Sequence, residues 1–192
     1  MQCFELNQIP DKNFLEHFRN KNGIYFISQE YSKNNEEHIL IKIGVATYKK
    51  QSDPSWPEKK QIKKGLESRL DSYLLYYPRG YYIYSIITCN SVQQAKNLEQ
   101  FVHNFLSKYK VNLPVEHTHG SEWFELRIKD LYKTIDYIKY EFKENITACY
   151  RFNPYFYLCT TEYLCKKRIN KEKTERDKRI KLELKSPIKK KQ

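Results

Sequence analysis

The chain has 192 residues, of which 40% are apolar and 15% aromatic, and a formal net charge of +12. This composition excludes a disordered chain, and the lack of any apolar run of membrane length excludes a spanning segment, so we expect a soluble, folded domain with an appendage and no membrane partner. Five cysteines without a close CxxC pair do not suit a disulfide framework, so we expect an intracellular setting and no disulfide-linked partner.

Two short strands separated by a polar loop form the first predicted motif. Residues 24–27 and 39–43 are compact runs of β-branched and aromatic residues. The polar stretch between them, 29–38, predicts a long hairpin loop. Tyr25 in the first strand and Lys42 in the second can therefore lie on one face of a hairpin, each beside a glycine.

A helix and a third strand are predicted next. Apolar residues recur at helical spacing over residues 59–76, with Arg69 on the edge of the apolar stripe. From that edge the guanidinium can lean towards the hairpin. Residues 81–89 then predict a strand by their β-branched and aromatic content.

A second helix follows and carries the least expected polar residue of the chain. Asn90 or Ser91 is its predicted N-cap. Glu99 points into the same face as the apolar residues of this helix. A carboxylate on a buried stripe is costly unless it is paired or holds a metal.

The two ends of the chain carry simpler signals. A short amphipathic helix is predicted at residues 11–19, and a final helix begins at Ile128. Residues 146–165 are unusually aromatic and predict either a small hairpin packed on the core or a partner-binding surface. The last stretch, 166–192, is strongly basic and predicts a tail that binds backbone phosphates, a solvated solubility tail or a nuclear-import signal.

The ordered set of motifs resembles a known family. Gly23-Ile24-Tyr25, Lys42-Ile43-Gly44, Arg69 in GLESRLDSY and Glu99 in AKNLEQFVHNFL resemble the GIY-YIG endonuclease superfamily, with lysine in place of the usual tyrosine. Together with HGSEWFEL at residues 119–126, the KIG form resembles the phage and large-DNA-virus branch. The fold we expect is α+β (α/β-like), with a small mixed, largely antiparallel three-stranded sheet flanked by helices and a basic C-terminal extension. The predicted units are a lead helix (1–22), a GIY-YIG-like nuclease domain (23–144), an aromatic appendage (145–165) and a basic tail (166–192).

The resemblance implies a metal-dependent DNA endonuclease that hydrolyses phosphodiester bonds. Glu99 would hold one Mg²⁺ or Mn²⁺ together with the substrate phosphate and water. Arg69 would stabilise charge on the phosphoryl oxygens, and Tyr25 would accept a proton from the attacking water or orient it.

Three further residues belong to the expected site. Lys42 acts either as a neutral base or as a phosphate-binding cation, and we favour phosphate binding or water orientation. His103, one turn after Glu99, is expected to support the site from behind. Tyr73 stands one turn after Arg69, where some family members have histidine.

Other readings of the same residues stay open. Loss of the second-motif tyrosine leaves a catalytically silent DNA-binding or virion-associated module as the alternative. RNA binding would need an exposed row of aromatics, for which Tyr81, Tyr82 and Tyr84 are the only candidates, and we expect these tyrosines in the core and at its rim instead. His117 and His119 with Glu122 suggest zinc, but no fourth ligand has suitable spacing.

DNA is the expected partner, and basic residues are the expected contacts. The predicted phosphate contacts are Lys49, Lys50, Lys63 and Lys64 beside the cleft, and Lys166, Lys167 and Arg168 in the tail. The oligomeric state stays open, including a homodimer, because one site of this type cuts one strand. The expected compartment is the cytoplasm, the nucleus or a virus factory.

Overall fold

The structure is a computed structural model that describes residues 2–6, 14–29, 36–48, 65–77, 80–112 and 122–158. Its strands are β1 (Gln2–Leu6), β2 (Asn22–Ser28), β3 (His38–Ala46), β4 (Tyr81–Cys89), β5 (Trp123–Arg127) and β6 (Ile146–Leu158). Its α-helices are α1 (Gly65–Tyr76), α2 (Val92–Phe105) and α3 (Ile128–Glu141), with short 3-10 helices η1 (Phe14–Phe18) and η2 (Ser107–Tyr109). The expected overall class, a mixture of helices and a mostly antiparallel sheet, is confirmed.

The expected three-stranded sheet is wrong, because the strands form a six-stranded sheet in the order β1-β6-β4-β2-β3-β5. All neighbours from β6 to β5 are antiparallel, and β1 adds to β6 in parallel. The three expected strands, β2, β3 and β4, lie together inside this sheet. The sheet continues beyond β3 with β5 and beyond β4 with β6 and then β1. This pairing satisfies backbone groups that bare edges at β3 and β4 would leave unpaired.

Two expectations for the ends of the chain also differ from the structure. The expected hairpin within 146–165 is instead one long strand, β6, which lies between β4 and β1. The described part of the expected helix at 11–19 is the 3-10 helix η1. An aromatic run fits a buried strand as well as a hairpin, so the sequence pattern alone did not separate the two.

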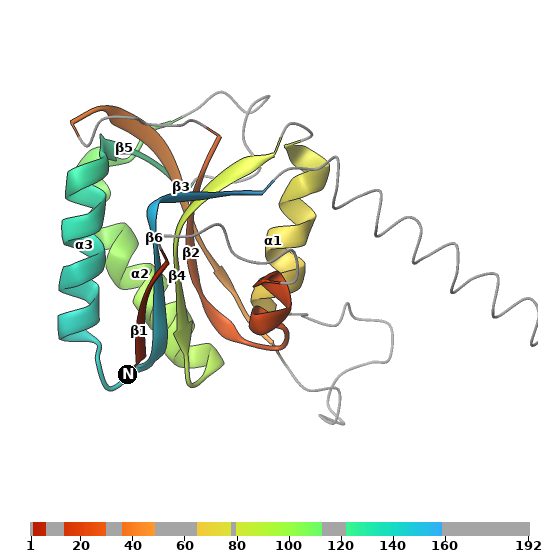
Figure 1. The fold of residues 1–192 in the computed structure, drawn as a ribbon. Coiled ribbons are helices and arrows are strands. Elements are labelled where there is room, and N and C mark those ends of the chain that lie inside the picture. Colours follow the sequence, from red (N-terminus) through yellow and green to blue (C-terminus); the bar gives the residue numbers. More distant parts are fainter. Residues whose placement is uncertain are drawn as a thin grey trace, which may run out of the picture.

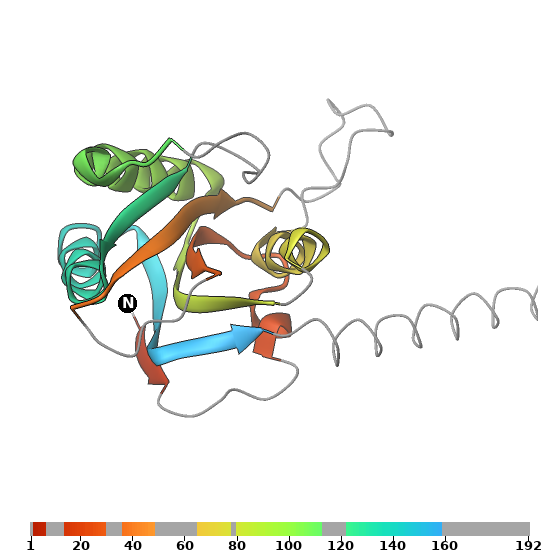
Figure 2. The ribbon, with the colours of Figure 1, turned by 90° about the horizontal axis from the view of Figure 1, so that it is seen from above.

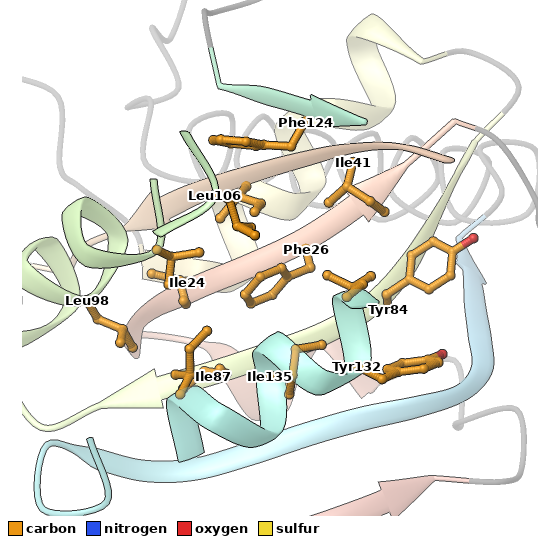
Figure 3. Packing of buried hydrophobic residues seen from close by; sticks show 14 of the residues in the cluster. Ile24, Phe26, Ile41, Tyr84, Ile87, Leu98, Leu106, Phe124, Tyr132 and Ile135 are labelled. Carbon is orange, nitrogen blue, oxygen red and sulfur yellow. The ribbon is translucent and has the colours of Figure 1, made fainter. Parts of the chain in front are cut away.

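Helices cover both faces of the sheet. Figures 1 and 2 show α1 and η1 on one face and α2 and α3 on the other. The α2 and α3 face holds the larger apolar cluster, in which Phe26 of β2, Leu98 of α2 and Ile135 of α3 meet (Figure 3). A second cluster joins α1 and η1 to the opposite face of the sheet. Within the described residues, no helix is both long and apolar enough to cross a membrane.

The start of α1 is fixed against the turn before β2. Gly65 has φ +79°, a left-handed backbone conformation that residues other than glycine rarely adopt. The Leu66 N–H donates to the Lys21 carbonyl at 3.0 Å, and Arg19 Nε lies 3.1 Å from Glu67 Oε2. These contacts set where α1 lies and therefore where its later residue, Arg69, reaches the sheet.

The predicted start of the second helix is confirmed. Ser91 is the N-cap of α2, and its hydroxyl accepts a hydrogen bond from the Gln94 N–H at 3.2 Å. Ala95, Leu98 and Val102 are the buried residues of the helix. With these residues facing the core, Glu99 lies along one side of the buried stripe and points towards β3.

Candidate functional site

The candidate site lies along the edge of β3 that carries no strand partner among the described residues, beyond the end of its pairing with β5. The last pair of that ladder joins Lys42 to Trp123, while β3 continues to Ala46. The Ile43 N–H donates to the Glu122 carbonyl at 3.1 Å, and the Val45 N–H donates to the Glu99 side chain. Thus the end of β5 and the α2 carboxylate occupy neighbouring positions along one edge of β3.

A group of hydroxyls and a guanidinium lies on the α1 face. Tyr25 Oη lies 2.7 Å from Tyr73 Oη, and Arg69 Nε donates to Tyr25 Oη at 3.4 Å. The Arg69 guanidinium carbon also lies 5.5 Å from the centre of the Tyr73 ring. Arg69 is exposed to solvent while both tyrosines are buried, so the tyrosines form a fixed base that holds an accessible cation.

Burial decides the protonation state of the two tyrosines. It raises the pKa of Tyr25 and that of Tyr73 above the ordinary tyrosine value. Both therefore stay as neutral hydroxyls at neutral pH. Tyr25 is 0% exposed, and its hydroxyl contacts Tyr73 and Arg69 instead of water. This geometry fits a role in holding Arg69 better than direct abstraction of a proton from water.

Lys42 is a buried amine with several partners. Its side chain is 0% exposed, and its Nζ lies 3.5 Å from Glu122 Oε2. The same Nζ lies 5.4 Å from the Trp123 ring centre and 6.0 Å from that of Tyr73. Burial lowers the pKa of Lys42, and the Glu122 carboxylate opposes this effect. The amine therefore lies between aromatic faces and one carboxylate, directly beside the Tyr25, Tyr73 and Arg69 group.

Glu99 of α2 brings a half-buried carboxylate to the same edge. Burial raises its pKa, and the nearby charge of Glu122 raises it further, whereas the Val45 N–H, Arg69 and Lys42 lower it. A cation beside Glu99 would remove much of this penalty. The residue that the sequence singled out as costly thus faces the cations of the site across β3.

The donor set suits a hard cation that keeps most of its water. In the part of the chain that the structure describes, no three His, Cys, Asp or Glu side chains gather closely enough to hold a metal by themselves. Mg²⁺ and Mn²⁺ sites at phosphates commonly use one or two carboxylates, with phosphate oxygens and water completing the shell. Glu99 fits such a site, since Val45 occupies only part of its acceptor capacity.

His103 lies one turn after Glu99 and contacts the backbone of β3. Its Nε2 lies 3.2 Å from the Ile43 carbonyl oxygen. Since a carbonyl only accepts, Nε2 carries the proton and donates. Burial lowers the pKa of His103, so the ring is neutral at neutral pH. Its contact holds α2 against the strand that carries Lys42.

Six of the predicted site residues lie close together in the structure, and the other predicted residues lie outside its described part. Tyr25, Lys42, Arg69 and Tyr73 lie in contact on one face, and Glu99 and His103 reach the same strand edge from α2. The predicted phosphate contacts lie outside the described residues: Lys49, Lys50, Lys63, Lys64, Lys166, Lys167 and Arg168. His117 and His119 also lie outside them.

The expectation that Tyr81, Tyr82 and Tyr84 belong to the core and its rim is confirmed, so the described sheet lacks the exposed aromatic row that RNA stacking would need. Helices cover both of its faces. Tyr81 and Tyr84 are buried, and the Tyr81 hydroxyl donates to the Leu70 carbonyl at 2.7 Å. Tyr82 is half-buried and packs against the larger core cluster. These tyrosines are parts of the core and its rim.

Sequence reasoning missed Glu122 and Trp123 as residues of the site. The sequence suggested Glu122 only as a zinc ligand together with His117 and His119. The segment HGSEWFEL, which contains Glu122 and Trp123, contributed only to the family resemblance. One signal was present, because Glu122 lies directly before the short strand WFELR and therefore at one end of it. Pairing Trp123 with Lys42 needed the register of β5 on β3, which the sequence does not display.

Comparison with known proteins adds one match. A family model described as the T5orf172 domain matches residues 22–139, a range that contains Tyr25, Lys42, Arg69 and Glu99. No curated protein and no solved structure matches the chain.

Proposed function

The chain belongs to the T5orf172 domain family, and from this premise we propose that it is a metal-dependent DNA endonuclease with a GIY-YIG-like site. The match supports a nuclease-like family. The observation that carries the finer proposal is the meeting of an exposed arginine, a buried lysine and a half-buried carboxylate at one open strand edge. This combination suits phosphodiester hydrolysis, because cations stabilise the negative charge of the phosphoryl oxygens in the transition state.

The cations of the proposed site bind and stabilise the phosphate. Arg69 presents a planar, permanently charged group from a surface position, which suits phosphate oxygens. Lys42 adds a buried point charge near the Tyr73 ring, which Arg69 also contacts. Glu99 would hold Mg²⁺ or Mn²⁺ together with the substrate phosphate. When bound, such a cation polarises a phosphoryl oxygen and makes water a better nucleophile.

The tyrosines keep Arg69 in its place. Tyr25 accepts a hydrogen bond from Arg69 and shares another with Tyr73. Since burial keeps both as neutral hydroxyls, Tyr25 positions the guanidinium and takes no proton at neutral pH. This assignment narrows the two roles that the resemblance implied for Tyr25 to one of orientation.

One observation favours the second candidate, a catalytically silent DNA-binding or virion-associated module. Tyr25 has no exposed surface, and Lys42 stands where the superfamily usually has a second tyrosine. A site that lost its proton acceptor would still bind phosphate through Arg69. The net charge of +12 supports a DNA partner in either case, and the predicted lysine and arginine contacts and a homodimer belong to the same proposal.

Substitution of Arg69 separates cleavage from binding. The protein and its Arg69→Gln variant are incubated with supercoiled plasmid, branched DNA and single-stranded DNA, in Mg²⁺ and then in Mn²⁺. Arg151→Gln is the matched control, because Arg151 also lies over a tyrosine ring, Tyr132, and faces α3 on the other side of the sheet.

We expect metal-dependent cleavage that falls about 100-fold or more in Arg69→Gln and is unchanged in Arg151→Gln. Equal cleavage by both variants would contradict the proposed site. Tight, salt-sensitive binding with no cleavage by the unmodified protein would instead support the silent DNA-binding module.

A further inference from the structure

Glu122 is a charged residue of the site to which the proposed function above assigns no role. It precedes β5, and its backbone carbonyl accepts the Ile43 N–H at 3.1 Å, so its position is tied directly to the strand of Lys42. Its Oε2 lies 3.5 Å from Lys42 Nζ. The Glu122 side chain is 35% exposed, whereas that of Lys42 is 0% exposed. One partner of this pair therefore keeps contact with water, and the other has none.

From this pair we propose that Glu122 is a positioning residue that keeps the buried Lys42 amine as an ammonium ion at neutral pH, so that Lys42 is a phosphate-binding cation and not a general base. The inference rests on the proposed nuclease function and deepens it. It decides between the two roles that the sequence left open for Lys42.

Two features of the surroundings favour the charged amine. The faces of Trp123 and Tyr73 lie 5.4 and 6.0 Å from Nζ, at distances where ring faces attract a cation. Glu122 supplies the nearest opposite charge. A buried ammonium without a counter-ion would lose its proton, because its hydration is gone. Glu122 is therefore the group whose removal should change the state of Lys42 most.

Charged and titratable groups reach Lys42 from each neighbouring element. Arg69 of α1 is a like charge that favours proton loss, and Glu99 of α2 is an opposite charge that favours proton retention. His103 of α2 is neutral at neutral pH, and Tyr73 of α1 and Tyr25 of β2 are neutral hydroxyls. Removing Glu122 leaves Glu99 as the remaining nearby carboxylate among the described residues, opposed by Arg69.

A direct titration of Lys42 tests the proposal without any need for catalysis. The full chain is labelled with ¹³C-lysine, and the side-chain signal of Lys42 is identified by its loss in Lys42→Met, and again in Lys42→Arg if the first variant folds poorly. The signal is followed from pH 6 to pH 11 in the unmodified protein, in Glu122→Gln and in Glu125→Gln. Glu125 is a matched control, because it is an exposed glutamate of β5 that pairs with His38.

We expect Lys42 to be charged at pH 7 in the unmodified protein, and its pKa to fall by about 1 to 3 units in Glu122→Gln but not in Glu125→Gln. A Lys42 that is already neutral at pH 7, or that titrates identically in Glu122→Gln, would overturn the proposal. Because no DNA is cut in this experiment, it reads the same whether or not the chain is a nuclease.

The pH profile of cleavage then tests what the charge does. If Lys42 acts as a cation, Glu122→Gln loses activity on the alkaline side at a lower pH than the unmodified protein does. Replacing Lys42 by arginine in the Glu122→Gln background should remove that loss, because arginine keeps its charge. A Glu122→Gln variant that instead gains activity below pH 7 would show that Lys42 works as a neutral base and would overturn the proposal.

Discussion

Gly44 lies directly opposite Tyr25 in the ladder between β2 and β3, and a Cβ atom on Gly44 would stand 2.3 Å from Tyr25 Oη and 2.7 Å from its Cζ. The glycine of the second motif therefore makes room for the tyrosine of the first. This contact explains why the two motifs belong together physically, since one supplies the ring and the other the space beneath it.

Gly44→Ala should destabilise the protein by about 1 to 3 kcal/mol, because a buried ring must move to accept the methyl group. Urea denaturation measures this change. The cost should be smaller in a Tyr25→Phe background, where the nearest atom is absent. A Gly44→Ala protein as stable as the unmodified one would show that Tyr25 does not occupy the described position.

Tyr73→Phe should reduce cleavage while costing only about 0.5 to 1.5 kcal/mol of stability, the usual net value of one hydrogen bond. The variant keeps the ring beneath Arg69 but removes the hydroxyl that Tyr25 contacts. Tyr81→Phe is the matched control, since it loses a buried hydrogen bond to the Leu70 carbonyl. Equal loss of cleavage in both variants would assign the effect to stability and not to the site.

Lys42→Met should abolish cleavage and remove the contribution of Lys42 to the pH dependence of stability, because methionine has a similar length but no titratable group. The pH dependence has a fixed sign. The lowered pKa of Lys42 means that the unfolded chain binds more protons between that pKa and 10.5, so stability rises with pH across this window. Urea denaturation from pH 7 to 11 should show this rise in the unmodified protein and lose it in Lys42→Met. The same rise of stability with pH in Lys42→Met as in the unmodified protein would contradict the account.

Binding of Mn²⁺ should weaken as pH falls, because burial and Glu122 raise the pKa of Glu99 above 4.5 and a cation needs the ionised carboxylate. Without metal, the folded state binds more protons than the unfolded chain between 4.5 and the raised pKa, so stability falls as pH rises through that window. Electron paramagnetic resonance of free Mn²⁺, measured with the protein and a short DNA, gives the affinity directly. An affinity that is independent of pH from 4 to 8 would exclude Glu99 as the ligand.

Local sequence patterns predicted those features of the site that a single helix or hairpin determines. The phase of α2 directed Glu99 to the buried flank, and the glycines beside Tyr25 and Lys42 indicated a close hairpin. The pair of Lys42 and Glu122 was beyond such reasoning, because its partners are far apart in the sequence and meet only through the register of β5 on β3. The aromatic run of β6 was ambiguous as well, since aromatic content favours a strand but does not distinguish one long strand from a hairpin.

The most direct test of the central claim is metal-dependent cleavage of supercoiled plasmid by the unmodified protein, by Glu99→Gln and by the control Glu125→Gln. The account predicts nicking that requires Mg²⁺ or Mn²⁺, is retained in Glu125→Gln and is lost in Glu99→Gln while that variant stays folded and still binds DNA. Cleavage by Glu99→Gln at the rate of the unmodified protein would contradict the claim that Glu99 holds the metal.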